Sequence, residues 1–438
     1  MGRLPQIQTA MRSTMTIRSA SLLVALLAGM LAGPPALAQQ DQELGSSLSG
    51  LLDYARQGNP EYAAMRAEED ATSQRIESAG ALPDPRFRAE LRDITKQGDQ
   101  SAMFLPGQVG STRYLLMQEF PWYGKRDLRR NIAEQDVEGA KARRLGAWAE
   151  ISSKIKTAYA RLYLLYRSER INQEISALMS RLEGVAQARY AGGLAAQQDV
   201  VRAQLELSAL RNELITLQAE RRQQQARLNG LLARPSGARL AEPQSLRSLP
   251  AEEQLDVAAI ENRALARNPQ IANEESRIKA AQMSRDLVLK NRYPDVTLGV
   301  SPIQYQGTVK EWELMVEFNI PLQQSSRRAQ ERESEAMLQL AQARKETAAR
   351  QVLTDLSENV EALGAARRTE NLVSNQLLPQ SELTYQAALV GYENGKVDFA
   401  TLLEAQRQIR QAKQSQLESQ VEAQVRLAEI ERIIGEDL

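Results

Sequence analysis

The side chains that could carry out chemistry in this sequence are limited by what it lacks. The 438 residues include no His and no Cys, which removes the usual ligands of zinc and copper and the commonest general base. No glycine-rich phosphate-binding loop is present, and the acids are scattered without a cluster. We therefore expect no enzyme, no metal site and no cofactor.

The N-terminal segment, residues 1–38, has the composition of a secretory signal peptide. Arg18 precedes an apolar run from Ser21 to Ala32, and Ala36-Leu37-Ala38 has the small residues of a cleavage site. The whole chain has 55 basic and 55 acidic residues, so no basic excess favours nucleic acid. These features predict an exported protein.

Long helices with short glycine turns are the main predicted elements. Apolar residues recur at steps of three and four, as at Ile151, Ile155 and Leu162, which indicates a seam that packs against another helix. Gly192 with Gly193, and Gly395 in the second half, are expected to reverse the chain. The patterns predict helical hairpins at residues 125–232 and 323–435, with a kink or loosened turn at Pro379.

The chain contains one structural unit twice. An Asn-Pro pair opens a helical segment at Asn59 and again at Asn268, and similar residues follow both glycine turns. The first repeat is expected at residues 39–232 and the second at residues 251–438. The Pro- and Gly-rich stretch 233–250 is the predicted linker.

Each repeat also contains two segments in which apolar and polar residues alternate, as in β-strands. The predicted strands are residues 86–94, 111–120, 295–302 and 311–320, joined by polar loops at 95–110 and 303–310. A soluble hairpin would show the same alternation. The export signal and the aromatic residues at the strand ends favour strands that face lipid. The predicted lipid-facing residues are Phe87, Leu91, Leu116, Val296, Leu298, Trp312, Leu314, Val316 and Phe318.

Four strands are too few for a closed barrel, which needs roughly eight or more. An open sheet edge is not stable in lipid, because its backbone groups would lack hydrogen-bond partners. The sequence therefore predicts a barrel shared among two or three copies of the chain.

Three stretches resemble the TolC-type outer-membrane efflux factors, and their residues are most similar to the heavy-metal, CzcC/CusC-like branch. They are residues 82–85 (LPDP), 118–126 (QEFPWYGKR) and 188–194 (ARYAGGL). The resemblance implies a mostly α-helical protein with a small β part. In that family a homotrimer forms a twelve-stranded shared β-barrel in the outer membrane and a coiled-coil α-helical tube in the periplasm. It is a passive exit duct, supplied by an inner-membrane RND-type pump through a periplasmic adaptor protein, here most similar to ducts for heavy-metal cations.

The resemblance also implies site residues. Residues at the adaptor-docking tips would be Tyr190, Gly192, Gly193, Leu194, Tyr392 and Gly395. Residues at the periplasmic aperture would be Asp199, Asp398, Thr401 and Glu404, with Thr401 at a position where an acid is expected. Lys396 and Val397 depart from the pattern of the second tip.

Other interpretations remain open at this stage. The same family includes multidrug and type I secretion ducts, and a soluble periplasmic coiled-coil scaffold or a nonspecific porin belongs to another class. Isolated helical acids such as Asp199 and Glu404 usually lie on a solvated face. The basic residues that follow Pro121, beginning with Lys125 and Arg126, are expected either near lipid headgroups or at a solvated helix start.

Overall fold

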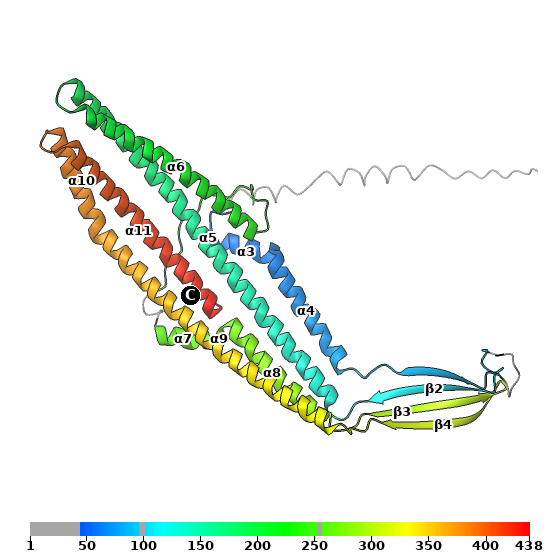
Figure 1. Cartoon of the computed structure of the whole chain (residues 1–438). Coiled ribbons are helices and arrows are strands. Elements are labelled where there is room, and N and C mark those ends of the chain that lie inside the picture. The colour runs from blue at the N-terminus through cyan, green and yellow to red at the C-terminus, as the bar shows by residue number, and fades with distance from the viewer. Residues whose placement is uncertain (1–43, 96–101, 103, 252–255) are drawn as a thin grey trace, which may run out of the picture.

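The computed structural model describes residues 44–95, 102, 104–251 and 256–438. The predicted signal peptide, residues 1–38, lies outside these residues. The molecule is elongated: long helices run side by side, and a four-stranded sheet extends from one end of them (Figure 1). At the opposite end, two turns that each connect a pair of long helices lie next to each other (Figure 1).

The two repeats have the same order of elements. The first contains α3 (Leu48–Gly58), α4 (Pro60–Gly80), β1 (Arg86–Arg92), β2 (Ser111–Phe120), α5 (Lys125–Ala191) and α6 (Gln197–Leu231). The second contains α7 (Val257–Arg267), α8 (Pro269–Lys290), β3 (Val296–Tyr305), β4 (Thr308–Phe318), α9 (Gln324–Leu372), the π-helix η2 (Val373–Leu377), α10 (Leu378–Glu393) and α11 (Phe399–Ile434). Residues 234–250 contain no helix or strand.

The repeated Asn-Pro pair has a structural reason. The Asn59 side chain accepts hydrogen bonds from the first backbone N–H groups of α4, and its amide donates to the Leu231 carbonyl at 2.8 Å. Asn268 caps α8 in the same way and donates to the Ile433 carbonyl at 2.7 Å. Each asparagine thus starts one helix and ties it to the end of the hairpin in its own repeat.

The helices lie side by side in one layer (Figure 1). Along the layer α6 packs on α5, α5 on α11, and α11 on α9 and α10, so that α6 and α9–α10 lie at its two margins. The predicted seam on α5 is buried: Ile151, Ile155 and Leu162 are 1%, 0% and 0% exposed. Burial of such seams between neighbouring helices provides the main apolar contact that holds the layer together.

The loosened turn predicted at Pro379 is present in the residues just before this proline. Residues Val373–Leu377 form a π-helix between α9 and α10. Proline has no backbone N–H to donate, and its ring clashes with the preceding turn, so the helix loosens there rather than continuing regularly. The second hairpin is therefore interrupted, whereas α5 runs unbroken from Lys125 to Ala191.

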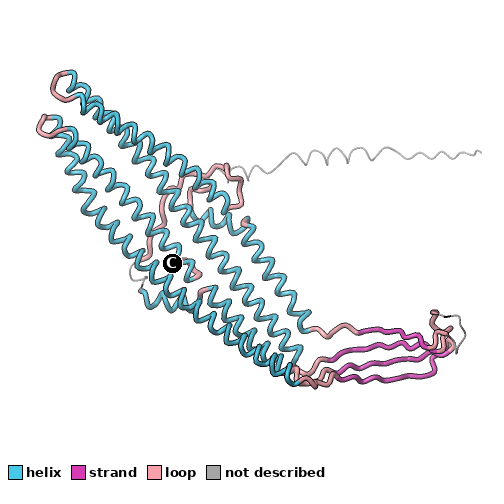
Figure 2. The backbone as a smooth tube through the Cα atoms, in the orientation of Figure 1, coloured by secondary structure: helices cyan, strands magenta, loops and turns pink. Residues whose placement is uncertain are grey.

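The sheet is antiparallel in the order β1-β2-β3-β4. Its strands are the magenta segments of Figure 2. The prediction of a loop at residues 303–310 is wrong, because β3 and β4 extend through most of this segment. Only Gln306 and Gly307, with φ of 47° and 90°, separate the strands. Positive φ at both residues is typical of a tight hairpin turn. β1 ends at Arg92 and β4 ends at Phe318, in both cases earlier than the sequence predicted.

Within the residues that the structure describes, no helix has the length and apolar character needed to cross a membrane.

Candidate functional site at the helical turns and the sheet

The turn between α5 and α6 (residues 192–196) and the turn between α10 and α11 (residues 394–398) have the same backbone hydrogen bonds. In the first turn the Leu194 N–H donates to the Arg189 carbonyl at 2.8 Å, and the Gly193 N–H donates to the Tyr190 carbonyl at 3.0 Å. In the second, Lys396 donates to Gly391 at 2.8 Å and Gly395 donates to Tyr392 at 3.0 Å. This double pattern ends a helix when the residue after its last turn is left-handed.

Only one glycine in each turn requires that conformation. Gly193 has φ of 70° and Gly395 has φ of 69°, whereas Gly192 has φ of −85°. The position equivalent to Gly192 in the second turn is occupied by Asn394. Gly193 and Gly395 are therefore fixed by backbone geometry, and Gly192 is not.

Arg189 joins the two turns. From the end of α5 its guanidinium donates to the carbonyl oxygens of Tyr392 and Glu393, at 2.6 and 2.9 Å, and lies 4.9 Å from the centre of the Tyr392 ring. These carbonyls belong to the end of α10, where a positive charge is favourable. No sequence pattern predicted this role for Arg189. Its place in the last turn of a helix was the available signal.

The predicted tip residues differ in exposure. Leu194 is 73% exposed and Tyr190 is 47% exposed, whereas Tyr392 is only 3% exposed. The Tyr392 ring packs against Phe399 at 5.4 Å between centroids. Burial raises the pKa of Tyr392, the nearby Asp199 carboxylate raises it further, and Arg189 opposes both. Tyr392 thus supports the turns from inside, while Tyr190 and Leu194 form their surface.

The four predicted aperture residues lie just beyond the turns but do not form one cluster. Asp398 caps α11: its carboxylate accepts hydrogen bonds from the Thr401 N–H at 2.9 Å and the Thr401 hydroxyl at 2.6 Å. These bonds lower the pKa of Asp398. Glu404 is exposed, accepts a long hydrogen bond of 3.5 Å from the Gln408 amide, and interacts electrostatically with Arg407. Asp199 is half-buried in the first turn of α6.

The sheet has one apolar face and one polar face. Cross-strand register aligns Phe87 with Leu116, Leu116 with Val300, and Val300 with Leu314, so these residues share a face. The same register places all nine residues predicted to face lipid on this side. Leu91 and Val296 are half-buried, and the other seven are exposed: Phe87, Leu116, Leu298, Trp312, Leu314, Val316 and Phe318.

Aromatic side chains lie at the end of the sheet nearest the helices. Trp122 and Tyr293 stack at 5.1 Å between centroids, and Tyr123 is 86% exposed. Gln118, which interrupts the apolar pattern of β2, donates its amide to the Pro83 carbonyl at 2.8 Å. The polar residue on the apolar face is therefore satisfied within the chain.

Lys125 and Arg126 are not arranged as either sequence-based interpretation expected, whereas Arg129 and Arg130 are exposed, as at a solvated helix start. Lys125 is 2% exposed, and its ammonium group lies 2.8 Å from Asp295 and 3.2 Å from the Tyr293 carbonyl. Arg126 donates to the Gly80 carbonyl at 2.9 Å. These side chains join the base of the sheet to the helices, a role that depends on partners far away in sequence.

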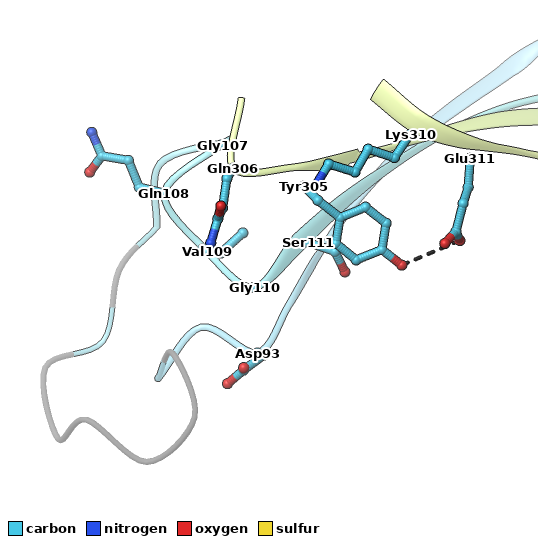
Figure 3. Close-up of a pocket in the computed structure, with 10 residues that line it drawn as sticks. All are labelled: Asp93, Gly107, Gln108, Val109, Gly110, Ser111, Tyr305, Gln306, Lys310 and Glu311. Carbon is cyan, nitrogen blue, oxygen red and sulfur yellow. Dashed lines mark hydrogen bonds between the residues drawn. The ribbon is translucent and has the colours of Figure 1, made fainter. Parts of the chain in front are cut away.

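A depression of ≈ 910 Å³ lies at the far end of the sheet, between the segments that connect the strands (Figure 3). Tyr305 and Glu311 line it and are hydrogen-bonded at 3.3 Å. None of the residues singled out from the sequence lies there. The described residues also contain no group of three or more acids placed to hold a metal ion.

The family model of outer membrane efflux proteins matches residues 51–234 and 261–436, which are most of the chain. The chain belongs to the outer membrane efflux protein family. This confirms the family expected from the sequence and the outer-membrane location, and it confirms that the protein is not an enzyme.

Individual relatives agree with this assignment. The cobalt-zinc-cadmium resistance protein CzcC of Cupriavidus metallidurans is 24% identical over 404 residues, covering 89% of this chain and 90% of CzcC. Solved structures share the fold. VceC of Vibrio cholerae is 20% identical with a TM-score of 0.75, covering 89% of this chain and 96% of VceC. CusC is 16% identical with a TM-score of 0.76, covering 89% of this chain and 92% of CusC.

Proposed function

We propose that this protein is the outer-membrane exit duct of a tripartite efflux system. Three copies would share one twelve-stranded β-barrel and one helical tube. An inner-membrane RND-type pump would supply substrate and energy, and a periplasmic adaptor would connect the pump to the duct. Transport through the duct itself is passive in this proposal.

The observation that supports the proposal most directly is the isolated sheet. Within the described residues it has four strands, an exposed apolar face and two outer strands, β1 and β4, that each pair with a strand on one side only. Such a face is unfavourable in water and suited to lipid, whereas the unpaired edges are unsuited to lipid. Pairing of these edges between copies satisfies both conditions.

The helical layer supports the same assembly. Its two margins carry apolar side chains that are exposed in the part of the chain that the structure describes. Val201, Leu205 and Ile215 on α6 are 55%, 70% and 68% exposed, and Leu383 and Val390 on α10 are 72% and 54% exposed. Contact between the α6 margin of one copy and the α10 margin of the next would cover these residues and continue the layer around a tube.

Heavy-metal cations are the proposed substrates, because the curated relative is a cobalt-zinc-cadmium resistance protein. Deleting the gene should lower the concentrations of cobalt, zinc or cadmium that stop growth, while tolerance of organic drugs is unchanged. Restored growth with the plasmid-borne gene is the control. Unchanged metal tolerance combined with lost drug tolerance would contradict the metal assignment and indicate a drug duct.

We propose that the exposed surface of the two turns docks the adaptor. Tyr190 and Leu194 provide apolar surface, while Gly192, Gly193, Gly395 and the buried Tyr392 shape it. Leu194→Asp should impair efflux and leave the assembled protein in the membrane. Lys413→Asp on α11, away from the turns, is a comparison variant. Normal efflux by Leu194→Asp would argue against docking at this surface.

We further propose that Glu404 and Asp199 line the narrow periplasmic end of the tube, with Asp398 and Thr401 holding the start of α11. Rings of carboxylates around a threefold axis would repel anions and favour cations. Glu404→Gln should lower the preference for cations over anions in planar bilayers, and Glu404→Ala should raise single-channel conductance. Identical ion preference and conductance in the variants of both Glu404 and Asp199 would exclude these residues from the aperture.

A further inference from the structure

The two outer strands of the sheet carry opposite charges. β1 has Arg86, Arg88 and Arg92 with a single acid, Glu90. β4 has the acids Glu311, Glu313 and Glu317 with a single base, Lys310. An excess of positive charge therefore lies at one edge of the sheet and an excess of negative charge at the other.

These charges lie on the same face, opposite the apolar one. The register aligns Glu90 with Arg113, Arg113 with Ile303, and Ile303 with Glu311 across all four strands. Directly paired residues point to the same side of a sheet, and side chains alternate along each strand. The arginines of β1 share the side of Glu90, and Glu313 and Glu317 share the side of Glu311.

Contacts within the chain leave most of this charge available. The side chains of Arg86, Arg88 and Arg92 are 76%, 60% and 53% exposed. Arg88 and Arg92 share one acid, Glu90, at 3.7 and 3.5 Å, and Arg86 has a marginal contact of 4.0 Å with Glu119.

The acidic edge is similar. Glu313 is paired with Arg113 at 2.7 Å, but its side chain is still 42% exposed. Glu311 accepts a hydrogen bond from the Tyr305 hydroxyl at 3.3 Å. Among the residues that the structure describes, Glu317 forms no ion pair. Both edges can therefore form further ion pairs with a suitable strand.

We propose that this charge arrangement selects which edges pair when copies of the chain share a barrel: β4 of one copy against β1 of the next, with arginine opposite glutamate on the polar face. Contact of β1 with β1, or of β4 with β4, places like charges opposite each other and is disfavoured. The charges thereby direct head-to-tail closure and exclude a two-fold contact. This inference rests on the proposed shared barrel and adds the residues that specify its seam.

Charge reversal tests the inference. One variant carries Arg86→Glu, Arg88→Glu and Arg92→Glu, a second carries Glu311→Arg, Glu313→Arg and Glu317→Arg, and a third combines all six changes. The oligomer extracted from outer membranes in mild detergent is quantified by native mass spectrometry. Arg350→Glu, whose side chain is 79% exposed on α9, is the control for charge reversal away from the edges.

Each three-residue variant should reduce the oligomer at least tenfold, and the six-residue variant should recover most of it, because opposite charges again face each other. The control should match the wild type. Normal oligomer in both three-residue variants, or no recovery in the six-residue variant, would overturn the inference. Absence of any oligomer in the wild type would instead overturn the proposed shared barrel.

Discussion

Two adjacent glycines in the first turn look equivalent in the sequence but differ in backbone conformation. Gly193 has φ of 70° and Gly192 has φ of −85°. A Cβ at Gly193 would meet no atom within 4 Å, so the constraint there comes from the backbone and not from space.

Gly193→Ala should therefore loosen the first turn, because the left-handed conformation costs a residue with a Cβ about 1–2 kcal/mol. Amide hydrogen exchange around this turn should accelerate by roughly 5- to 30-fold. Gly192→Ala is the matched control and should leave exchange unchanged or slightly slower. Equal effects of the two substitutions would contradict the assigned geometry.

Asp398, one of the proposed aperture residues, also caps α11, and these two roles can be tested separately. Hydrogen bonds from Thr401 lower the pKa of Asp398 below its ordinary value of 3.8. Because the pKa is lower in the folded state, the cap contributes stability above about pH 4 and loses it as the pH falls through the folded value.

We expect the protection of amides at the start of α11, measured relative to their intrinsic exchange rate at each pH, to fall in wild-type protein below pH 4. Asp398→Asn should keep the cap and remove this pH dependence, because asparagine caps helices as well as aspartate does. Asp398→Ala should have low protection at every pH. A wild-type protein with no loss of protection in acid would exclude the carboxylate as the cap.

At the scale of elements, the hairpins, the strands and the repeat could be predicted because each depends on local pattern. Residues spaced by three and four gave α5 its buried seam, and alternation placed the apolar residues of the strands on one face. The tight turn at Gln306-Gly307 could not be predicted, because polar composition does not distinguish a loop from the ends of two paired strands. The burial of Lys125 could not be predicted, because its partner, Asp295, lies in the other repeat.

Arg189 is the clearest example of a contact between elements that the sequence could not reveal, since it joins the α5–α6 hairpin to the end of α10. Arg189→Ala removes two charge-assisted hydrogen bonds and the contact with the Tyr392 ring. The two hairpins should then separate more readily. Single-channel conductance in planar bilayers should rise.

Arg189→Lys is the informative comparison. Lysine keeps the charge but lacks the planar fork that reaches two carbonyls together, so its conductance should be intermediate. Conductance at the wild-type level in Arg189→Ala would show that this contact does not hold the hairpins in place.

At the scale of the whole molecule, the chain has three kinds of surface that a single copy leaves unsatisfied. The apolar face of the sheet requires lipid, the edges of β1 and β4 require strands, and the apolar margins of the helical layer require other helices. The polar residues of the opposite sheet face, including Arg113 with its partners Glu313 and Ser301, would line the lumen. The proposed assembly, a closed ring of chains in a membrane, would satisfy all of these surfaces.

The central claim is that the strands of several chains combine to enclose one pore in the outer membrane. The most direct test is the mass of the complex purified from outer membranes in detergent, measured by native mass spectrometry. A shared barrel should give a complex of three chains that requires detergent to stay in solution. A single chain that remains soluble in water without detergent would contradict it.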